Sequence, residues 1–284
     1  MSTISDPDRY DVLIVGAGPA GLSAALVLGR MRRRTLVLDT GAPAHAVSEA
    51  VHGFLAQDGT SPPVLRRTGR EQLAPYDTVE VRDIAAAGAR RCDDGTFALQ
   101  LGDGVRAAGR HLLLAHGMHY GLPDVAGLAP LWGSRVFHCP YCHGWEVRGR
   151  RLAVIDSGER AAHQAELLSS LSDDVEVVRD SDIERVDEQD GEVRLILPDD
   201  TALTRDALFI QPALALASDL AVTLGADLTE AGAVAVDPAG QSSIEGLYAA
   251  GDAATAVQSV AVAAGSGARA AYAINASLAG GAPR

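Results

Sequence analysis

The 284-residue sequence predicts an α/β fold with two domains. Near its start, a short apolar run leads through a glycine-rich loop into a helix-like segment, and the same strand-then-helix order begins again at residue 151. Near its end, residues 243–252 form a further strand-like segment before a run of small residues typical of a helix. Alternating strands and helices favour parallel sheets covered by helices. We expect the last segment to complete the first domain, so that the second domain is an insertion.

Composition and charge exclude several classes of protein. Hydrophobic residues make up 47% and charged residues 21% of the chain, which is typical of a folded globular protein. The net charge of −13 disfavours nucleic acids and anionic membrane surfaces as partners, because the field of the protein repels polyanions. No apolar run approaches the roughly 18 residues of a membrane span, and the first residues are acidic where a secretory signal is basic. The sequence therefore predicts a cytoplasmic protein with no membrane partner.

The first strand-loop-helix segment has the pattern of a dinucleotide site. Residues 12–15 predict a buried strand and residues 22–28 a helix. The loop between them contains Gly16, Gly18, Pro19, Ala20 and Gly21. Glycines at this spacing allow a tight turn, approach of the backbone to a pyrophosphate, and close packing of the helix on the strand. A second strand, residues 35–38, ends in Asp39, whose carboxylate would hydrogen-bond a ribose hydroxyl.

The rest of the chain supplies further strands and helices. After Asp39 we expect a helix at residues 66–73 and strands at residues 78–82, 97–101, 105–107 and 111–115. In the second domain we expect strands at residues 151–155, 175–178, 191–197, 202–204 and 208–210, and a helix at residues 159–171. Gly251 and Asp252 then separate the last strand from a helix at residues 258–278. This arrangement would place the Asp252 carboxylate beside a sugar hydroxyl.

A second candidate site lies between the two series of strands. It consists of His138, Cys139, Pro140, Tyr141, Cys142 and His143. Two thiols at this spacing can form a disulfide and so store two electrons. A structural zinc site requires four ligands, and Cys92 adds no second pair, so we expect no metal. Because cytoplasmic thiols are kept reduced, the pair favours redox catalysis. Pro140 would open a helix whose amino terminus lowers the pKa of a neighbouring cysteine.

Three motifs occur in a fixed order along the chain. They are GAGPAG at residues 16–21, CPYC at residues 139–142 and GLYAAGD at residues 246–252. In this order they resemble the low-molecular-weight thioredoxin reductases, which are FAD-dependent pyridine nucleotide-disulfide oxidoreductases. The resemblance spans essentially the whole chain and implies two Rossmann-like domains of the three-layer ββα type. It implies a split FAD domain, residues 1–117 and 245–284, an inserted pyridine-nucleotide-type domain with the CxxC motif, residues 118–244, and a homodimer.

The resemblance also implies roles for individual residues. FAD would be held by Gly16, Gly18, Pro19, Ala20, Gly21, Asp39, Gly251 and Asp252, with Gln258 and Ser259 near the flavin ring. Cys142 would be the thiol nearest the flavin, and Cys139 the thiol that exchanges with substrate. The family carries an acid directly after the second cysteine, where this chain has His143. Since an unperturbed histidine has a pKa of about 6.5, His143 is the first candidate for acid-base catalysis and His138 the second.

The second nucleotide motif departs from the pattern of the family. NADPH-binding members have a glycine after the first strand of the inserted domain, whereas this chain has Asp156, and only Gly158 and Ala161 fit. A carboxylate there adds bulk to a tight turn and negative charge near a pyrophosphate. Arg179 is followed by acidic residues instead of a second arginine, which weakens recognition of a 2′-phosphate. The inserted NADPH-type domain is therefore expected to be degenerate.

An intact CxxC motif beside a degenerate nucleotide motif is similar to the gliotoxin and holomycin dithiol oxidases. The leading hypothesis is an FAD-dependent dithiol oxidase that closes a disulfide in a small natural-product dithiol and reduces O2 to H2O2. A substrate thiolate would attack Cys139, the second substrate thiol would resolve the mixed disulfide, and Cys142 would pass the electrons to FAD. An NADPH-dependent thioredoxin reductase and a non-catalytic flavin redox sensor are the two alternatives.

Overall fold

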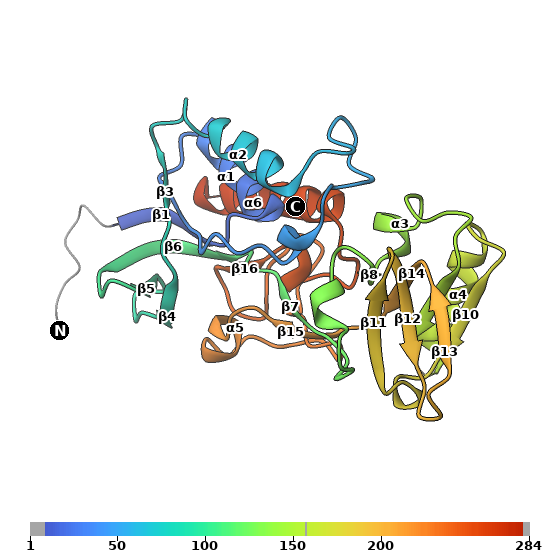
Figure 1. Ribbon diagram of the computed structural model, residues 1–284. Coiled ribbons are helices and arrows are strands. Elements are labelled where there is room, and N and C mark those ends of the chain that lie inside the picture. The colour runs from blue at the N-terminus through green and yellow to red at the C-terminus, as the bar shows by residue number, and fades with distance from the viewer. Residues whose placement is uncertain (1–8, 157, 281–284) are drawn as a thin grey trace. The chain divides into compact units, whose positions relative to one another are not determined.

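The structure, a computed structural model, describes residues 9–156 and 158–280 (Figure 1). The described residues form two compact units. The first unit contains residues 9–44, 63–119 and 215–280, and the second contains residues 45–62 and the described part of 120–214. Both units combine a parallel sheet with helices, which confirms the predicted α/β fold class.

The first unit is built around a sheet of seven strands. They are β1 (Arg9–Val15), β2 (Thr35–Leu38), β3 (Val79–Arg82), β4 (Ala86–Arg91), β5 (Phe97–Leu101), β6 (Arg106–Leu114) and β16 (Leu247–Ala249). Strands β3, β2, β1, β6 and β16 are parallel, whereas β5 and β4 extend the sheet beyond β6 in the antiparallel sense. β1 lies between β2 and β6, so the glycine loop follows a central strand.

Helices α1 (Pro19–Arg30) and α6 (Val260–Leu278) lie side by side in the first unit (Figure 1). Small residues allow this close contact, since a Cβ atom at Gly267 would overlap the carbonyl group of Ala20. Neighbouring residues of β1 point to opposite faces of the sheet. Ile14 is therefore buried in the apolar cluster that includes both helices, and Leu13 in the cluster on the other face.

The second unit has three layers. Its parallel sheet has the order β10 (Val175–Val178), β9 (Leu152–Ile155), β14 (Ala207–Ile210) and β8 (Val136–Phe137), and its antiparallel sheet the order β11 (Arg185–Gln189), β12 (Glu192–Ile196) and β13 (Ala202–Arg205). Helix α4 (Glu159–Ser169) packs on β9 and β10. In β9, Val154 is buried in a cluster with α4, whereas Ile155 is buried in a cluster with the antiparallel sheet. The parallel sheet is thus the middle layer.

The remaining elements are short. They are α2 (Pro62–Glu71), α3 (Pro140–His143), α5 (Leu220–Thr223), β7 (Met118–Gly121), β15 (Ala213–Leu216) and the 3-10 helices η2 (Ala44–Val47), η3 (Ala129–Leu131), η4 (Asp180–Asp182) and η5 (Gly251–Ala253). Strands β7 and β15 form a two-stranded sheet. Among the described residues, none of the helices combines the length and the apolarity that crossing a bilayer requires.

Two sequence-based expectations for the strands were wrong. Residues 105–107 and 111–115 were expected to be separate strands, but β6 runs without interruption because its start pairs with β5 and its end with β1 and β16. Strands β7, β8 and β15 were not predicted, nor were β4 and β11. Both carry several charged or small residues and lie at an edge of their sheet, so they show no clear apolar alternation.

The compact units also differ from the expected domain limits in two places. Residues 215–244, expected in the insertion, lie in the first unit, where Leu220 and Val234 are buried in the same cluster as Leu13. Residues 45–62, expected in the FAD domain, group with the second unit. The residue limits of the FAD domain and of the pyridine-nucleotide-type domain therefore stay a prediction.

Candidate functional site

The glycine loop of the first unit connects β1 to α1. Gly16 has a φ angle of 105°, and a Cβ atom there would overlap the Ala115 carbonyl group and lie 2.9 Å from the Cα atom of His116. A Cβ atom at Gly21 would overlap the Gly16 carbonyl oxygen. Both positions therefore require glycine. They hold the start of α1 tightly against the end of β1.

Gly18 differs from its neighbours because it faces open space. A Cβ atom at this position would meet nothing within 4 Å. Helix α1 begins at Pro19, and no side chain caps it at Gly18. The first N–H groups of a helix lack intrahelical partners and attract anions. An open glycine before an uncapped helix end fits the pyrophosphate of a dinucleotide.

The segment after β16 lies against the glycine loop. A Cβ atom at Gly251 would lie 3.0 Å from the Cβ atom of Ala20. The Gly251 N–H donates a hydrogen bond to Ser266 Oγ on α6 at 2.9 Å. Asp252 follows in η5 and is half-buried. The structure therefore brings together two motifs that are more than two hundred residues apart in the sequence.

Gln258 and Ser259 are held by their own segment. The Gln258 amide donates to the carbonyl oxygen of Thr255 at 3.1 Å, and Ser259 Oγ accepts from the N–H of Val262 at 3.1 Å. Ser259 is thus the N-cap of α6, which begins at Val260 and not at residue 258 as expected. A contact between these two side chains and the flavin stays a prediction.

Asp39 ends β2 and is buried, with 7% of its surface exposed. Its carboxylate accepts hydrogen bonds from the guanidinium of Arg66 and from the Gly41 N–H, and Arg70 lies 3.5 Å away. The two arginines occupy positions i and i+4 of α2, a spacing that places both on one face of a helix. Neither arginine was predicted as a partner of Asp39, although their spacing could have indicated one. A ribose hydroxyl would donate a hydrogen bond to a carboxylate that Arg66 and the Gly41 N–H already hold in place.

The second unit contains the disulfide. Cys139 and Cys142 are joined, and their Cα atoms lie 5.2 Å apart. Cys139 is the N-cap of α3 and Pro140 is its first residue, as predicted. The N–H groups of Cys142 and His143 both donate to the Cys139 carbonyl oxygen, at 3.1 and 3.2 Å. Both cysteines are half-buried. The short helix therefore fixes the disulfide at a position that solvent reaches.

His143 is packed on an aromatic ring. Its imidazole is stacked on Phe137, with ring centroids 4.4 Å apart and planes inclined by 15°. Both ring nitrogens are buried, and neither has a hydrogen-bond partner among the described residues. Burial lowers the pKa of His143, the Glu146 carboxylate raises it and His52 lowers it. In the disulfide form the imidazole is therefore largely neutral at neutral pH.

His138 is also surrounded by aromatic rings. Its ring centroid lies 4.9 Å from that of Tyr120 and 5.9 Å from that of Trp132. Burial, with a smaller contribution from His143, lowers the pKa of His138 to about 4. Its carbonyl oxygen accepts a hydrogen bond from the Gln164 amide of α4 at 2.6 Å. A histidine so difficult to protonate suits packing better than proton transfer near pH 7.

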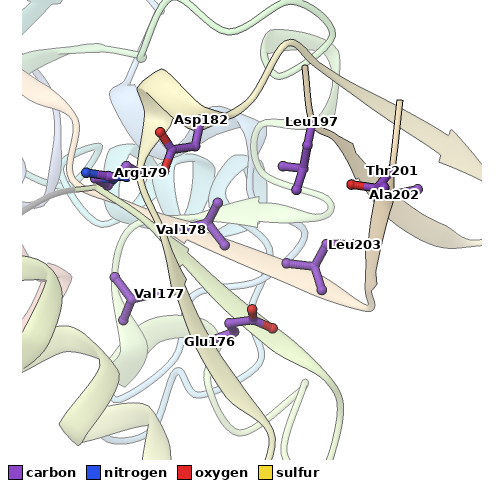
Figure 2. A pocket seen from close by; sticks show the side chains of 9 residues that line it. All are labelled: Glu176, Val177, Val178, Arg179, Asp182, Leu197, Thr201, Ala202 and Leu203. Carbon is purple, nitrogen blue, oxygen red and sulfur yellow. Dashed lines mark hydrogen bonds and ion pairs between the residues drawn. The ribbon is translucent and has the colours of Figure 1, made fainter. Parts of the chain in front are cut away.

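The second glycine loop lies between β9 and α4. Asp156 directly follows β9, and Gly158 has a φ angle of 109°, but a Cβ atom at Gly158 would meet nothing within 4 Å. After β10, Arg179 forms an ion pair with Asp182 at 2.8 Å. Both side chains line a cleft of about 530 Å³ between β10 and the turn from β12 to β13 (Figure 2). The arginine available for a 2′-phosphate is thus already paired with a carboxylate.

The two sets of predicted residues lie in different units. The first unit brings the glycine loop, Asp39 and Gly251 into one region, and the second unit holds the disulfide with His138 and His143. This division agrees with a dinucleotide site and a thiol site on separate frameworks. The sequence profile of the pyridine nucleotide-disulphide oxidoreductase family matches residues 10–183 and 160–267. The chain belongs to this family.

Membership of this oxidoreductase family makes the protein an FAD-dependent enzyme of the thioredoxin reductase-like group. The chain is 31% identical to thioredoxin reductase sirT of Leptosphaeria maculans, over 95% of this chain and 94% of the relative. It is 30% identical to thioredoxin reductase tcpT of Claviceps purpurea, over 88% of each chain.

Solved structures of the oxidoreductase family agree with the fold. The crystal structure of an oxidoreductase from Agrobacterium tumefaciens has a TM-score of 0.88 and 32% identity, covering 95% of this chain and 99% of that one. The crystal structure of HlmI has a TM-score of 0.89 and 32% identity, covering 99% of this chain and 95% of that one. The open glycine loop and the uncapped start of α1 fit the FAD that the family binds.

Proposed function

We propose that this oxidoreductase is a dithiol oxidase. It closes a disulfide in a small-molecule dithiol, and O2 receives the two electrons, so that one dithiol and one O2 yield one disulfide and one H2O2. The observation that supports this function is the intact Cys139–Cys142 disulfide in a unit whose nucleotide loop carries Asp156. Relatives named thioredoxin reductases support thiol-disulfide chemistry in general.

The chain's own residues perform the exchange of thiols. A substrate thiolate attacks Cys139 Sγ, which breaks the bond to Cys142 and releases the Cys142 thiolate. The second substrate thiolate attacks the substrate sulfur of the mixed disulfide and releases Cys139. The glycine loop and Asp39 would hold FAD, which would supply two-electron chemistry between the cysteine pair and O2. Half-burial of Cys139 and its position at the start of α3 suit attack from solvent.

His143 accepts the proton that each substrate thiol loses. Its low pKa in the disulfide form leaves it neutral and able to act as a base. Its ring nitrogens are buried against Phe137 in this form, so proton transfer requires the ring to turn away from Phe137. His138 has no such route to protonation near pH 7, because its pKa is about 4.

An anaerobic absorbance experiment tests this function. The flavin of the purified holoenzyme should bleach when dithiothreitol is added and should regain its colour on admission of air, with one H2O2 formed for each disulfide. NADPH should leave it unbleached. Cys142→Ser should abolish the bleaching by dithiol, whereas Cys92→Ser, which alters the free cysteine of the first unit, should leave it unchanged. Rapid bleaching by NADPH would refute the dithiol-oxidase assignment.

An NADPH-dependent thioredoxin reductase is the second candidate function. The names of the relatives favour it, because sirT and tcpT are both called thioredoxin reductases. Bleaching of the flavin by NADPH, followed by electron transfer to a protein disulfide, is the outcome that this function requires.

We also propose that the protein is a cytoplasmic homodimer. Size-exclusion chromatography with light scattering tests the dimer, and cell fractionation tests the location.

A further inference from the structure

Helix α4 buries a polar side chain in its apolar face. This face packs on β9 and β10, and its buried residues are Ala161, Gln164 and Leu168. Ala161 and Leu168 belong to the apolar cluster that also contains Phe137 and Phe209. Gln164 lies between them on the helix, with 2% of its surface exposed. Because burial of an amide costs free energy that an apolar side chain would not, an amide here points to a role other than packing.

The Gln164 amide contacts the segment that leads into the disulfide. Its Nε2 atom donates a hydrogen bond to the carbonyl oxygen of His138 at 2.6 Å. Since a carbonyl oxygen can only accept, this bond fixes the orientation of the amide. The Oε1 atom of the same amide is buried and has no hydrogen-bond partner among the described residues. The side chain therefore leaves one polar atom unpaired while it keeps the bond to His138.

His138 connects a very short strand to the disulfide helix. Strand β8 lies at an edge of its sheet, and its pairing with β14 ends at Phe137. Helix α3 begins at Pro140, with Cys139 as its N-cap. His138 is the residue between the end of β8 and Cys139. The Gln164 bond is therefore made where the ladder of the sheet has ended and the helix has not yet begun.

The bond from Gln164 acts on the position of Cys139. A peptide group is planar, so holding the carbonyl oxygen of His138 also holds the N and Cα atoms of Cys139. The backbone of Cys139 is extended, with a φ angle of −110° and a ψ angle of 109°. Its carbonyl oxygen accepts from the N–H groups of Cys142 and His143. The Cα atoms of the two cysteines are thereby held 5.2 Å apart, a separation that a disulfide spans.

We infer that Gln164 is a positioning residue of the thiol site: its amide holds the peptide before Cys139, so that Cys139 stays where it bonds to Cys142 and receives the substrate thiolate. The inference rests on the proposed exchange at Cys139. A disulfide requires the two cysteines to keep this geometry, whereas a dithiol does not. Loss of the bond should therefore disfavour the disulfide. A residue that only fastened α4 to the sheet would change the stability of the fold and leave the disulfide as it is.

The test measures the balance between disulfide and dithiol in Gln164→Met, which removes the donor and keeps an unbranched side chain. Holoenzyme is equilibrated without oxygen in mixtures of reduced and oxidised dithiothreitol, and free thiols are alkylated and located by mass spectrometry. We expect the equilibrium to move toward the dithiol by about fivefold, the factor that one net hydrogen bond contributes. The melting temperature should change little, because the unpaired Oε1 atom is removed together with the bond.

Ser172→Ala is the matched control. Ser172 belongs to the same unit, is 6% exposed, and donates through Oγ to the carbonyl oxygen of Arg150 at 2.5 Å. The substitution therefore removes a buried bond from a side chain to a carbonyl group outside residues 136–143. We expect a lowered melting temperature and a wild-type balance of disulfide and dithiol. Flavin content and melting temperature establish that each variant is folded, and Gln164→Leu repeats the test with a second apolar side chain.

The outcomes separate the inference from the proposed function. A wild-type balance in Gln164→Met and Gln164→Leu would overturn the inference, because Gln164 would then only support the packing of α4. An equal shift in Ser172→Ala would also overturn it, since any weakening of the unit would then have the same effect. Bleaching of the wild-type flavin by dithiothreitol tests the function separately. Its absence would refute the dithiol oxidase, while the balance in the variants would still decide the role of Gln164.

Discussion

The two strand-loop-helix segments of this protein both contain a glycine with a positive φ angle, but at different positions of the loop. Gly16 and Gly158 have φ angles of 105° and 109°, so both turns need glycine for conformation. Gly158 stands at the position of Gly18, and both are open before an uncapped helix, whereas the enclosed position, Gly16, is Asp156 in the second loop. In the first loop glycine meets a conformational and a packing requirement, and in the second a conformational one. The two loops therefore differ at the first position, where the first loop has an enclosed glycine and the second has Asp156.

The residues that end the second strand of each unit differ in the same way. Asp39 after β2 is 7% exposed and accepts hydrogen bonds from Arg66 and a backbone N–H. Arg179 after β10 lies on the surface in an ion pair with Asp182, and the two side chains are 66% and 45% exposed. A buried, hydrogen-bonded carboxylate is positioned for a ligand, whereas an exposed ion pair is worth little. After its second strand, the first unit has a carboxylate that is held in place, whereas the second has an ion pair exposed to solvent.

The largest effect should come from the same substitution in both loops. Gly16→Ala should abolish FAD incorporation, because its Cβ atom would overlap the Ala115 carbonyl group in addition to the strain of a positive φ angle. Gly158→Ala should retain FAD and lose only about 1 kcal/mol of unfolding free energy, from the strain alone. The absorbance ratio at the flavin and protein maxima measures the first effect, and urea unfolding the second. Equal loss of FAD in both variants would refute the difference between the loops.

The next effect concerns the groups after the second strands. Asp39→Asn should weaken FAD binding by roughly tenfold to a hundredfold, because one arginine then faces a neutral amide and the ribose loses a charged acceptor. Arg179→Ala should leave FAD affinity unchanged and lower stability by less than about 1 kcal/mol, since its ion pair is exposed. Titration of the apoprotein with FAD, followed by fluorescence, measures the affinities. An unchanged affinity in Asp39→Asn would remove Asp39 from the site.

A smaller effect should follow from placing glycine at the first position of the second loop. Asp156→Gly removes a negative charge from the place where a pyrophosphate would lie, and we expect about a tenfold faster bleaching of the flavin by NADPH, from a rate near zero. Glu166→Gln, which removes a charge from an exposed position of α4, is the matched control and should have no effect. Stopped-flow absorbance under anaerobic conditions measures both. A wild-type rate already as fast as that of the variant would contradict the degenerate loop.

The smallest expected effect concerns the pH dependence of the unfolding free energy, through an ion pair of the second unit. The Arg151 guanidinium, which hydrogen-bonds Asp206, lowers the pKa of that carboxyl from 3.8 to about 2. A carboxyl with a lowered pKa in the folded state contributes stability above pH 4, and this stability is lost as the pH falls from about 4 to 2. Because Arg151 is partly exposed, we expect a loss of about 1 kcal/mol. Asp206→Asn should remove this part of the pH dependence in urea unfolding, whereas Asp173→Asn, at an exposed bend of the same unit, should leave it in place.

Sequence patterns were sufficient for the local parts of the site. The glycine loop, the start of α3 at Pro140 and the strand that ends in Asp39 were all predicted, because each depends on a few consecutive residues and on backbone geometry. The partners of those residues were not predicted. Arg66 and Arg70 reach Asp39 from a helix more than twenty residues later, and His52 reaches Glu146 across more than ninety residues. Pairings of this kind depend on how the loops fold back.

The surroundings of His138 and His143 were not predicted from the sequence. Their type and position beside the cysteines indicated a group that titrates near neutral pH. The tertiary structure instead buries both rings, stacks His143 on Phe137 and packs His138 against Tyr120 and Trp132. This burial lowers the pKa of each histidine. Burial is a property of the packed chain, since aromatic neighbours from other segments exclude the water that would stabilise the charge.

By itself, the sequence determined the two α/β units, the glycine loop, and the spacing of a cysteine pair that can close. These follow from periodicity and short-range geometry, which are written in consecutive residues. Only the tertiary structure decided that Gly16 is enclosed and Gly158 is open, that Asp39 is held by arginines, and that the 45–62 loop joins the disulfide unit. Those outcomes depend on packing between distant segments, where shape and charge become complementary only after the chain has folded.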